Sequence, residues 1–219
     1  MKLEEPLDFG WNMKTVKSAE TEYVTSPNGV YYLSIGHETL KGITPQMLEW
    51  WFKNIGGEMT YQGRVCTKYR VWHPRDHIRW ELHRNGRKDG SVGVGSYFRI
   101  VEAFGRNPDW TIDSAELVTK LDHTGIRLVK RILGIEIFSL EHWFEPVGDT
   151  DCSYRSLMSV GDEGWFGRLF FNRLIRPWIF TREMGFAWMK HNVEEVGNFE
   201  FFLPELYSSQ TAVTSPFAV

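Results

Sequence analysis

Residues 181–204 read TREMGFAWMKHNVEEVGNFEFFLP and contain the longest helical pattern in the chain. Apolar residues in this stretch recur at spacings of three and four, which places them on one face of a helix. They are Phe186, Met189, Val193, Val196 and Phe199. Thr181 is a suitable N-cap, and Pro204 is expected to end the helix. The stretch therefore predicts a long C-terminal helix over residues 181–202 whose apolar face packs on another element.

The chain before this helix has the pattern of an antiparallel sheet. Apolar and β-branched segments are separated by short turns such as Asn85-Gly86 and Gly148-Asp149, with little room for crossover helices. The expected strands cover residues 23–24, 30–35, 65–71, 93–101, 115–122, 126–132, 135–145 and 153–160. The predicted fold class is α+β, with a curved antiparallel sheet wrapped on the long C-terminal helix in a helix-grip arrangement that leaves a ligand cavity.

With 219 residues, the chain is long enough for one sizeable domain. We expect an N-terminal arm over residues 1–20, a single helix-grip domain over 21–207 and a flexible tail over 208–219. A second helix is expected to begin at Thr44-Pro45, because Thr suits the N-cap and Pro the first helical position.

Composition excludes several classes of function. The net charge is −3 and the basic residues are dispersed, which argues against nucleic-acid binding. The two cysteines, Cys66 and Cys152, form no CxxC pair, so neither a thiolate zinc site nor a disulfide framework is indicated. We see no signal peptide and no apolar run of about 18 residues, and expect a cytoplasmic protein without membrane partners.

Histidine and glutamate gather in four segments that are far apart in the sequence. Their leading residues are His73, Glu102, His142 and His191. A fold that converged them would offer three imidazoles and one carboxylate to a divalent metal, which is a hydrolytic set rather than a structural one. An ordinary buried histidine is the alternative interpretation for His191.

Several of these segments resemble the 2,4-diacetylphloroglucinol hydrolase family, which includes phloretin hydrolase. The matching segments are Trp50-Trp51-Phe52, residues 69–77 with their Trp-His-Pro-x-Asp-His core, residues 141–145 (EHWFE) and residues 191–200 (HNVEEVGNFE). The resemblance runs in order from about residue 44 to 205, and the last segment is the most specific.

The resemblance implies a zinc-dependent C–C bond hydrolase with a Bet v 1-like helix-grip domain and a large cavity. It places the Zn²⁺ ligands at His73, Glu102, His142 and His191. Asp76 and His77 are then expected as hydrogen-bonding or proton-transfer groups near the metal, and Glu145 or Glu194 as a carboxylate that orients a ligand histidine. Tyr69 and Tyr154 lie near the positions of the family's substrate-binding tyrosines, where this chain has Val65 and Leu157.

We therefore predict a metal-dependent hydrolase that cleaves a C–C bond next to a ketone, in a retro-Claisen type of reaction. The expected substrate is a hydrophobic acylphenol or polyketide-like molecule of secondary metabolism, because aromatic residues dominate the candidate segments. Two alternatives stay open: a metal-dependent cyclase, isomerase or dehydratase on the same fold, and a non-catalytic carrier of hydrophobic ligands. The sequence determines neither the exact substrate nor whether the chain forms a homodimer.

Overall fold

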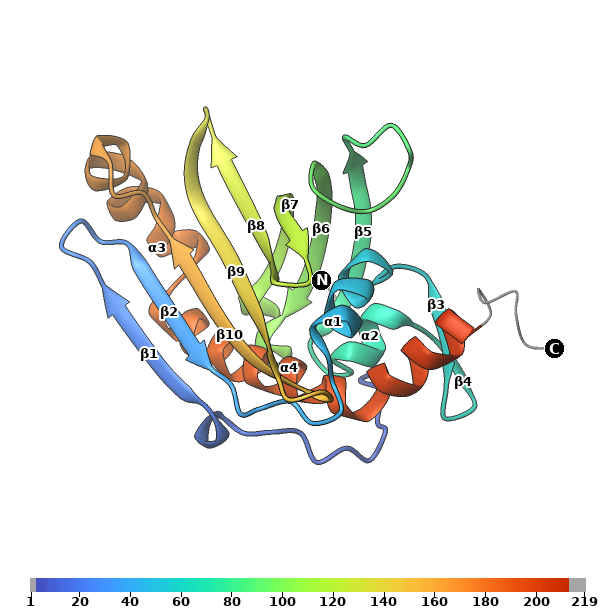
Figure 1. The fold of residues 1–219 in the computed structure, drawn as a ribbon. Helices are drawn as coiled ribbons and strands as arrows, with labels where there is room; N and C mark the ends of the chain where they lie inside the picture. Colours follow the sequence, from blue (N-terminus) through green and yellow to red (C-terminus); the bar gives the residue numbers. More distant parts are fainter. Residues whose placement is uncertain (1–2, 213–219) are drawn as a thin grey trace.

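The computed structural model describes residues 3–212 and is built on an eight-stranded antiparallel sheet (Figure 1). The strand order is β1-β2-β10-β9-β8-β7-β6-β5. The strands are β1 (Glu20–Thr25), β2 (Tyr31–Gly36), β5 (His77–Asn85), β6 (Ser96–Ala103), β7 (Thr111–Asp122), β8 (Gly125–Ile132), β9 (Ile135–Val147) and β10 (Asp151–Val160). Short connections join neighbours from β5 to β10, as the turn pattern predicts.

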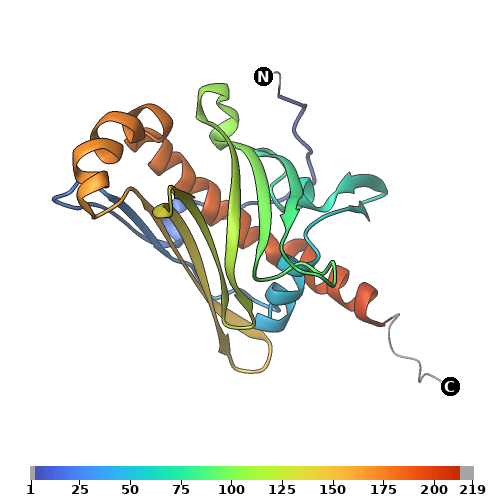
Figure 2. The same ribbon diagram turned by 90° about the horizontal axis from the view of Figure 1, so that it is seen from above.

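Helix α4 (Arg182–Ala212) runs across this sheet (Figures 1 and 2). Shorter elements surround the pair: η1 (Val16–Ser18), α1 (Pro45–Lys53), β3 (Glu58–Tyr61), β4 (Arg64–Thr67), α2 (Lys68–Trp72), η2 (Phe104–Arg106), η3 (Pro108–Trp110), η4 (Gly167–Ile175) and α3 (Arg176–Ile179). A long C-terminal helix packed on a curved antiparallel sheet confirms the predicted α+β, Bet v 1-like helix-grip fold.

The start of α1 agrees with the sequence prediction in detail. Thr44 is the N-cap, its hydroxyl accepts a hydrogen bond from the backbone N–H of Met47 at 3.3 Å, and Pro45 is the first helical residue. Leu48, Trp51 and Phe52 form the buried face of this helix. The sequence fits because Pro lacks the N–H that a first helical position leaves unbonded.

Three local predictions differ from the structure. Residues 65–71 were expected as one strand, but β4 ends at Thr67, whose hydroxyl accepts from the N–H of Arg70 and caps α2. Strands β3 and β5 were not expected; most of the exposed residues of β5 are polar or charged. Helix α4 continues through Pro204, since Phe202, Leu203 and Leu206 on both sides of the proline are buried in the core.

The two ends of the chain differ in structure: the N-terminal segment is mostly irregular, and the C-terminal segment continues a helix. Residues 3–15 contain no helix or strand, which fits an arm, and η1 and the start of β1 complete that segment. Helix α4 includes residues 208–212 of the expected tail, and residues 213–219 lie outside the described residues. No helix within residues 3–212 is long and apolar enough to cross a membrane.

The aromatic residues of α4 and its neighbours form the main core. Phe199 is fully buried, and its ring lies 5.9 Å from that of Trp51 and 5.2 Å from that of Trp72. These contacts join α4 to α1 and α2 and thereby fix the helix relative to the residues that precede β5.

Replacing Phe199 with alanine should lower the free energy of unfolding by about 3–5 kcal/mol, because a buried aromatic ring leaves a cavity. Phe186→Ala on the same helix is the matched control, since that side chain is half exposed, and should cost about 1 kcal/mol. Urea unfolding of both variants measures the difference. Equal losses of unfolding free energy in the two variants would contradict the burial of Phe199 against α1 and α2.

Candidate metal centre

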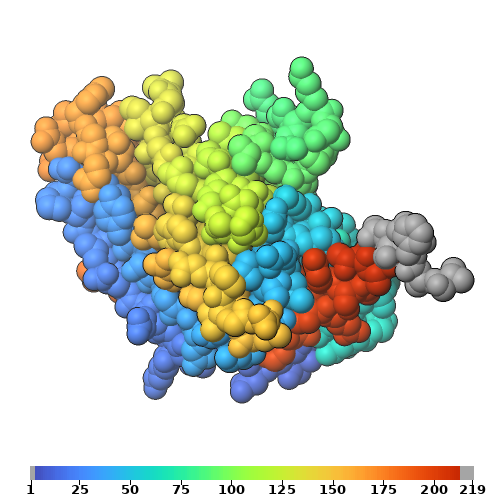
Figure 3. Space-filling model, viewed as in Figure 1, coloured from blue at the N-terminus to red at the C-terminus, as the bar shows by residue number. Residues whose placement is uncertain are grey.

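A cavity of about 530 Å³ lies between the sheet and α4. Most of its lining is apolar, and includes Phe52, Trp72, Phe98, Ile126, Leu140 and Trp188. Figure 3 shows the β8–β9 hairpin and the β5–β6 connection on opposite sides of a hollow in the molecular surface. A largely apolar cavity with a few polar groups is the usual form of a small-molecule site.

Three elements bring ionisable side chains together behind one part of this cavity wall, where Glu102 and Glu195 line the cavity. The α2–β5 segment carries His73 and Asp76 in its turn and His77 as the first residue of β5, and β6 carries Glu102 directly opposite His77 in the strand register. Helix α4 adds His191 and Glu195, which share a face because they are four residues apart. These groups are buried or nearly so, which makes their charge balance energetically important.

His77 presents an unpartnered nitrogen to two carboxylates. Its Nδ1–H donates to the carbonyl oxygen of Tyr69 at 2.8 Å, which leaves a lone pair on Nε2. That Nε2 has no hydrogen-bond partner among the described residues and lies 3.3 Å from oxygens of both Glu102 and Glu195. A neutral imidazole with its second nitrogen bonded to a carbonyl is the usual form of a metal ligand.

His191 repeats this arrangement from α4. Its Nδ1–H donates to Asp76 Oδ2 at 3.1 Å, and Asp76 is itself held by the backbone N–H of Gly105 at 2.8 Å. The buried Nε2 of His191 has no hydrogen-bond partner among residues 3–212 and lies 3.6 Å from oxygens of Glu102 and Glu195. Ligand atoms of His77, His191 and Glu195 lie within 4.8 Å of one another, and the carboxylate of Glu102 lies 3.3 Å from Nε2 of His77 and 3.6 Å from Nε2 of His191.

The local potential among these ligand atoms is negative. Burial alone would lower the pKa of His191, but the carboxylates of Glu102, Glu195 and Asp76 outweigh it and raise that pKa to about 9. Burial also raises the pKa of Glu195, because the low-dielectric interior disfavours a carboxylate. A cation bound between the carboxylates would relieve both effects, so the residues fit a divalent metal.

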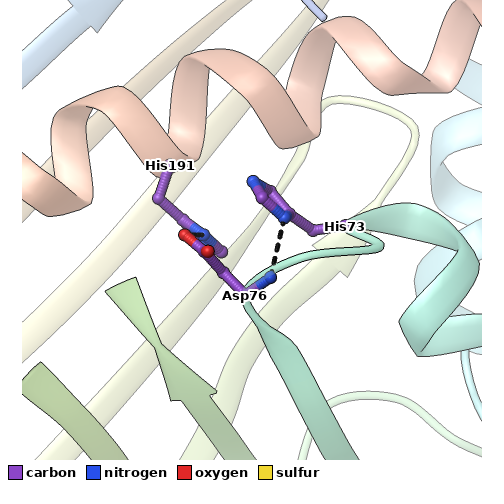
Figure 4. Close-up of side chains that lie close together, drawn as sticks. All are labelled: His73, Asp76 and His191. Carbon is purple, nitrogen blue, oxygen red and sulfur yellow. Dashed lines mark hydrogen bonds and ion pairs between the residues drawn. The ribbon is translucent and has the colours of Figure 1, made fainter. Parts of the chain in front are cut away.

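His73 lies beside this group but has both nitrogens occupied. Its Nδ1 accepts from the backbone N–H of Asp76 at 3.1 Å, and its Nε2–H donates to Glu194 at 3.3 Å. Its ring stacks on His191 with centroids 4.5 Å apart, and Figure 4 shows His73, Asp76 and His191 close together. Ligand atoms of these three residues also lie within 4.8 Å of one another, but His73 would first have to give up a bond.

His142 is not brought to the same group. It faces the cavity from β9, which lies three strands from β6, or roughly 14 Å across the sheet. Its Nδ1 is 2.9 Å from Ser156 Oγ, and that hydroxyl is also bonded to His37. The ligand set expected from the sequence is thus divided, with Glu102 and His191 at the centre, His73 beside it and His142 apart.

The predicted tyrosines differ in position. Tyr69 lines the cavity, stacks on His77 with centroids 3.9 Å apart and donates its hydroxyl hydrogen to Glu102. Burial raises the pKa of Tyr69 well above its usual value, so this hydroxyl keeps its proton. Tyr154 is fully buried next to His142, and its hydroxyl has no partner among the described residues.

Of the expected orienting carboxylates, Glu194 bonds His73, whereas Glu145 pairs with Arg155 on the surface. Glu195 was missed as a central residue, because two adjacent glutamates on a helix usually form a solvated face. Its spacing of four residues from His191 was the available signal, since it puts both side chains on one helix face.

The comparisons with known proteins agree with the resemblance seen in the sequence. The family model described as the DAPG hydrolase PhiG domain matches residues 11–111, slightly less than half of the chain, and confirms that resemblance. The matched range contains Tyr69, His77 and Glu102. No curated protein matches the chain.

Solved structures with similar folds are distant. A conserved protein of unknown function from Enterococcus faecalis covers 90% of this chain and 92% of its own, with 10% identity and a TM-score of 0.44. Human STARD10 covers 92% of this chain and 83% of its own, with 10% identity and a TM-score of 0.44. Norcoclaurine synthase from Thalictrum flavum covers 88% of this chain and 95% of its own, with 13% identity and a TM-score of 0.40. Likenesses this remote carry no argument about function.

The environment of His142 predicts a pH dependence of stability. Burial lowers the pKa of His142 from 6.5 to about 3. The unfolded chain therefore binds a proton first as the pH falls below 6.5, and folding is destabilised between pH 6.5 and 3. His142→Gln should remove up to about 1 kcal/mol per pH unit of this slope.

Urea unfolding between pH 7 and 4.5 tests the prediction. His123→Gln, in the exposed turn between β7 and β8, is the control and should leave the slope unchanged. Parallel profiles for the wild type and His142→Gln would contradict the buried, neutral state of His142.

Proposed function

We propose that the chain is a zinc-dependent hydrolase that cleaves the C–C bond next to a ketone in an acylphenol or polyketide-like substrate. The observation that carries the proposal is the pair of buried, unpartnered Nε2 atoms of His77 and His191 facing the carboxylates of Glu102 and Glu195. We propose these four residues as the metal ligands, in place of the set expected from the sequence. Imidazole nitrogens and carboxylate oxygens, without thiolates, are ligand types that catalytic Zn²⁺ sites use.

The DAPG hydrolase match supports hydrolysis as the reaction class. A bound zinc ion would supply Lewis acidity and lower the pKa of water to about 7. The reaction adds water across the bond between the acyl carbon and the ring, giving a carboxylic acid and a ring carbon that takes up a proton. A phenolic ring suits this reaction, because it can accept the electron pair of the broken bond as an enolate.

The residues around the proposed centre have defined tasks. Asp76 accepts the Nδ1–H of His191, which fixes the tautomer and directs Nε2 toward the centre. Tyr69 keeps its hydroxyl proton and donates it in a hydrogen bond to Glu102, so its hydroxyl oxygen is the atom that can hydrogen-bond the bound ligand, as an acceptor. His142, neutral and on the cavity wall, is a second such group. The apolar lining excludes water and strengthens each of these bonds.

The protein purified without chelator should contain about one zinc per chain. His77→Ala and His191→Ala should each lose most of the metal and the activity, because each removes a proposed ligand. His142→Ala should keep the metal but lose activity, whereas exposed His123→Ala should change neither. Elemental analysis with a hydrolysis assay measures both quantities.

Each outcome of this series decides between ligand sets. Loss of zinc in His142→Ala, with zinc kept in His77→Ala, would restore the set expected from the sequence. A folded protein that binds aromatic ligands but no metal would favour the carrier function over both enzyme functions.

Substrate preference follows from the cavity lining. Acylphenols should be hydrolysed in preference to small keto acids, because few basic groups line the apolar cavity to replace the hydration of a carboxylate. Side-by-side assays of acylphenols, β-diketones and keto acids, with products identified by mass, test this. Products whose masses sum to that of the substrate plus one water indicate hydrolysis. A product with the mass of the substrate indicates the cyclase or isomerase, and a product lighter by one water indicates the dehydratase. Preference for keto acids would contradict the proposed substrate class.

A further inference from the structure

A second group of polar side chains interrupts the apolar wall of the cavity. Ser114 and Glu116 lie on β7 and Lys130 on β8, and all three line the cavity. The strand register pairs Ile100 with Ser114 and Phe98 with Glu116, so both polar residues lie on the sheet face that carries Glu102. Glu116 is four residues along β7 from Ile112, the partner of Glu102, and hence belongs to a different part of the wall.

The three side chains form a small network within an otherwise apolar region. Lys130 Nζ donates to Ser114 Oγ at 2.9 Å, and Ser114 and Glu116 lie on the same face of β7, two residues apart. Glu116 is only 5% exposed. Burial raises the pKa of Glu116 to about 8, and repulsion from Glu102 contributes, while Ser114 and Lys130 act in the opposite direction.

A buried carboxyl group on an apolar wall destabilises the fold unless it is well paired, and such positions are commonly functional. Glu116 offers a hydrogen-bond acceptor to the cavity, and Lys130 offers charged donors beside it. A phenolic hydroxyl satisfies both, because its hydrogen is donated to the carboxyl group and its oxygen accepts from the ammonium. Neither an ether nor a carboxylate has a hydrogen to donate, so either would leave the acceptor oxygen of Glu116 unpaired.

We propose that Ser114, Glu116 and Lys130 form a second polar subsite, which binds a phenolic hydroxyl group of the ligand away from His77 and Glu102. The inference rests on the proposed function only in taking an aromatic molecule as the ligand. It selects, among aromatic ligands, those with a hydroxyl group on the part that points away from the proposed metal centre.

Binding of 4-hydroxybiphenyl and biphenyl to the full chain tests the subsite. Neither probe contains a ketone, so binding is measured without hydrolysis, by quenching of the intrinsic tryptophan fluorescence. The wild type should bind 4-hydroxybiphenyl about tenfold more tightly than biphenyl, which is the effect of one or two buried hydrogen bonds. Glu116→Leu and Lys130→Met should each reduce this ratio to about two or less, and Glu116→Gln should keep most of it, because an amide retains the acceptor.

Asp109→Asn is the matched control, since Asp109 also lines the cavity but is exposed, and it should leave the ratio unchanged. Thermal unfolding of Glu116→Leu should occur no lower than that of the wild type, because the substitution removes a poorly solvated carboxyl group. If that variant fails to fold, Lys130→Met and Glu116→Gln still give the ratio.

Equal affinity of the wild type for the two probes, or an unchanged ratio in Lys130→Met, would overturn the subsite. These results are independent of zinc content and hydrolysis. A metal-free, inactive protein that keeps the tenfold ratio would remove the proposed function and leave the subsite. A zinc-containing hydrolase that binds the two probes equally would remove the subsite and leave the proposed function.

Discussion

The close approach of Glu102 and Glu195 in the protein interior is the constraint on which the site depends. The two carboxylates come from β6 and α4, and both lie 3.3 Å from Nε2 of His77. Two carboxylates gathered around one buried histidine are costly in a low-dielectric interior unless a cation or protons balance their charge. The fold therefore places buried carboxylates where helix and sheet meet, which is typical of a site kept for function.

Hydrogen bonds to the main chain hold α4 and the α2–β5 turn together against this repulsion. The indole N–H of Trp72 donates to the backbone carbonyl oxygen of Glu195 at 2.8 Å. The side-chain amide of Asn198 donates to the backbone carbonyl oxygen of Trp72 at 2.9 Å. His191 is tied to the same turn through Asp76. Because these bonds cross between the two elements, a shift of α4 along its axis by even one residue would break them. The side chains proposed as ligands are thus positioned by hydrogen bonds between a helix and the α2–β5 segment.

The sequence predicts the fold better than the site, for a physical reason. Periodicity and capping are local, so the long helix, most strands and the Thr44 cap could be recognised. Convergence of side chains depends on strand order, and His142 lies apart because β9 is three strands from β6. Choosing between His73 and His77 needs their hydrogen bonds: one histidine has both nitrogens engaged and the other has one free. Neither property is encoded in spacing alone.

The distribution of polar groups within the cavity also bears on specificity. An apolar lining by itself accepts many ligands in many orientations, because the hydrophobic effect is non-directional. Hydrogen-bonding groups at separate places on the wall remove that freedom, since a ligand must satisfy both or leave one buried and unpaired. Tyr69 and Glu102 lie in one part of the cavity, and Glu116 and Lys130 in another. A ligand with oxygens at matching positions would therefore be held in one orientation, with a defined bond facing the carboxylates of Glu102 and Glu195.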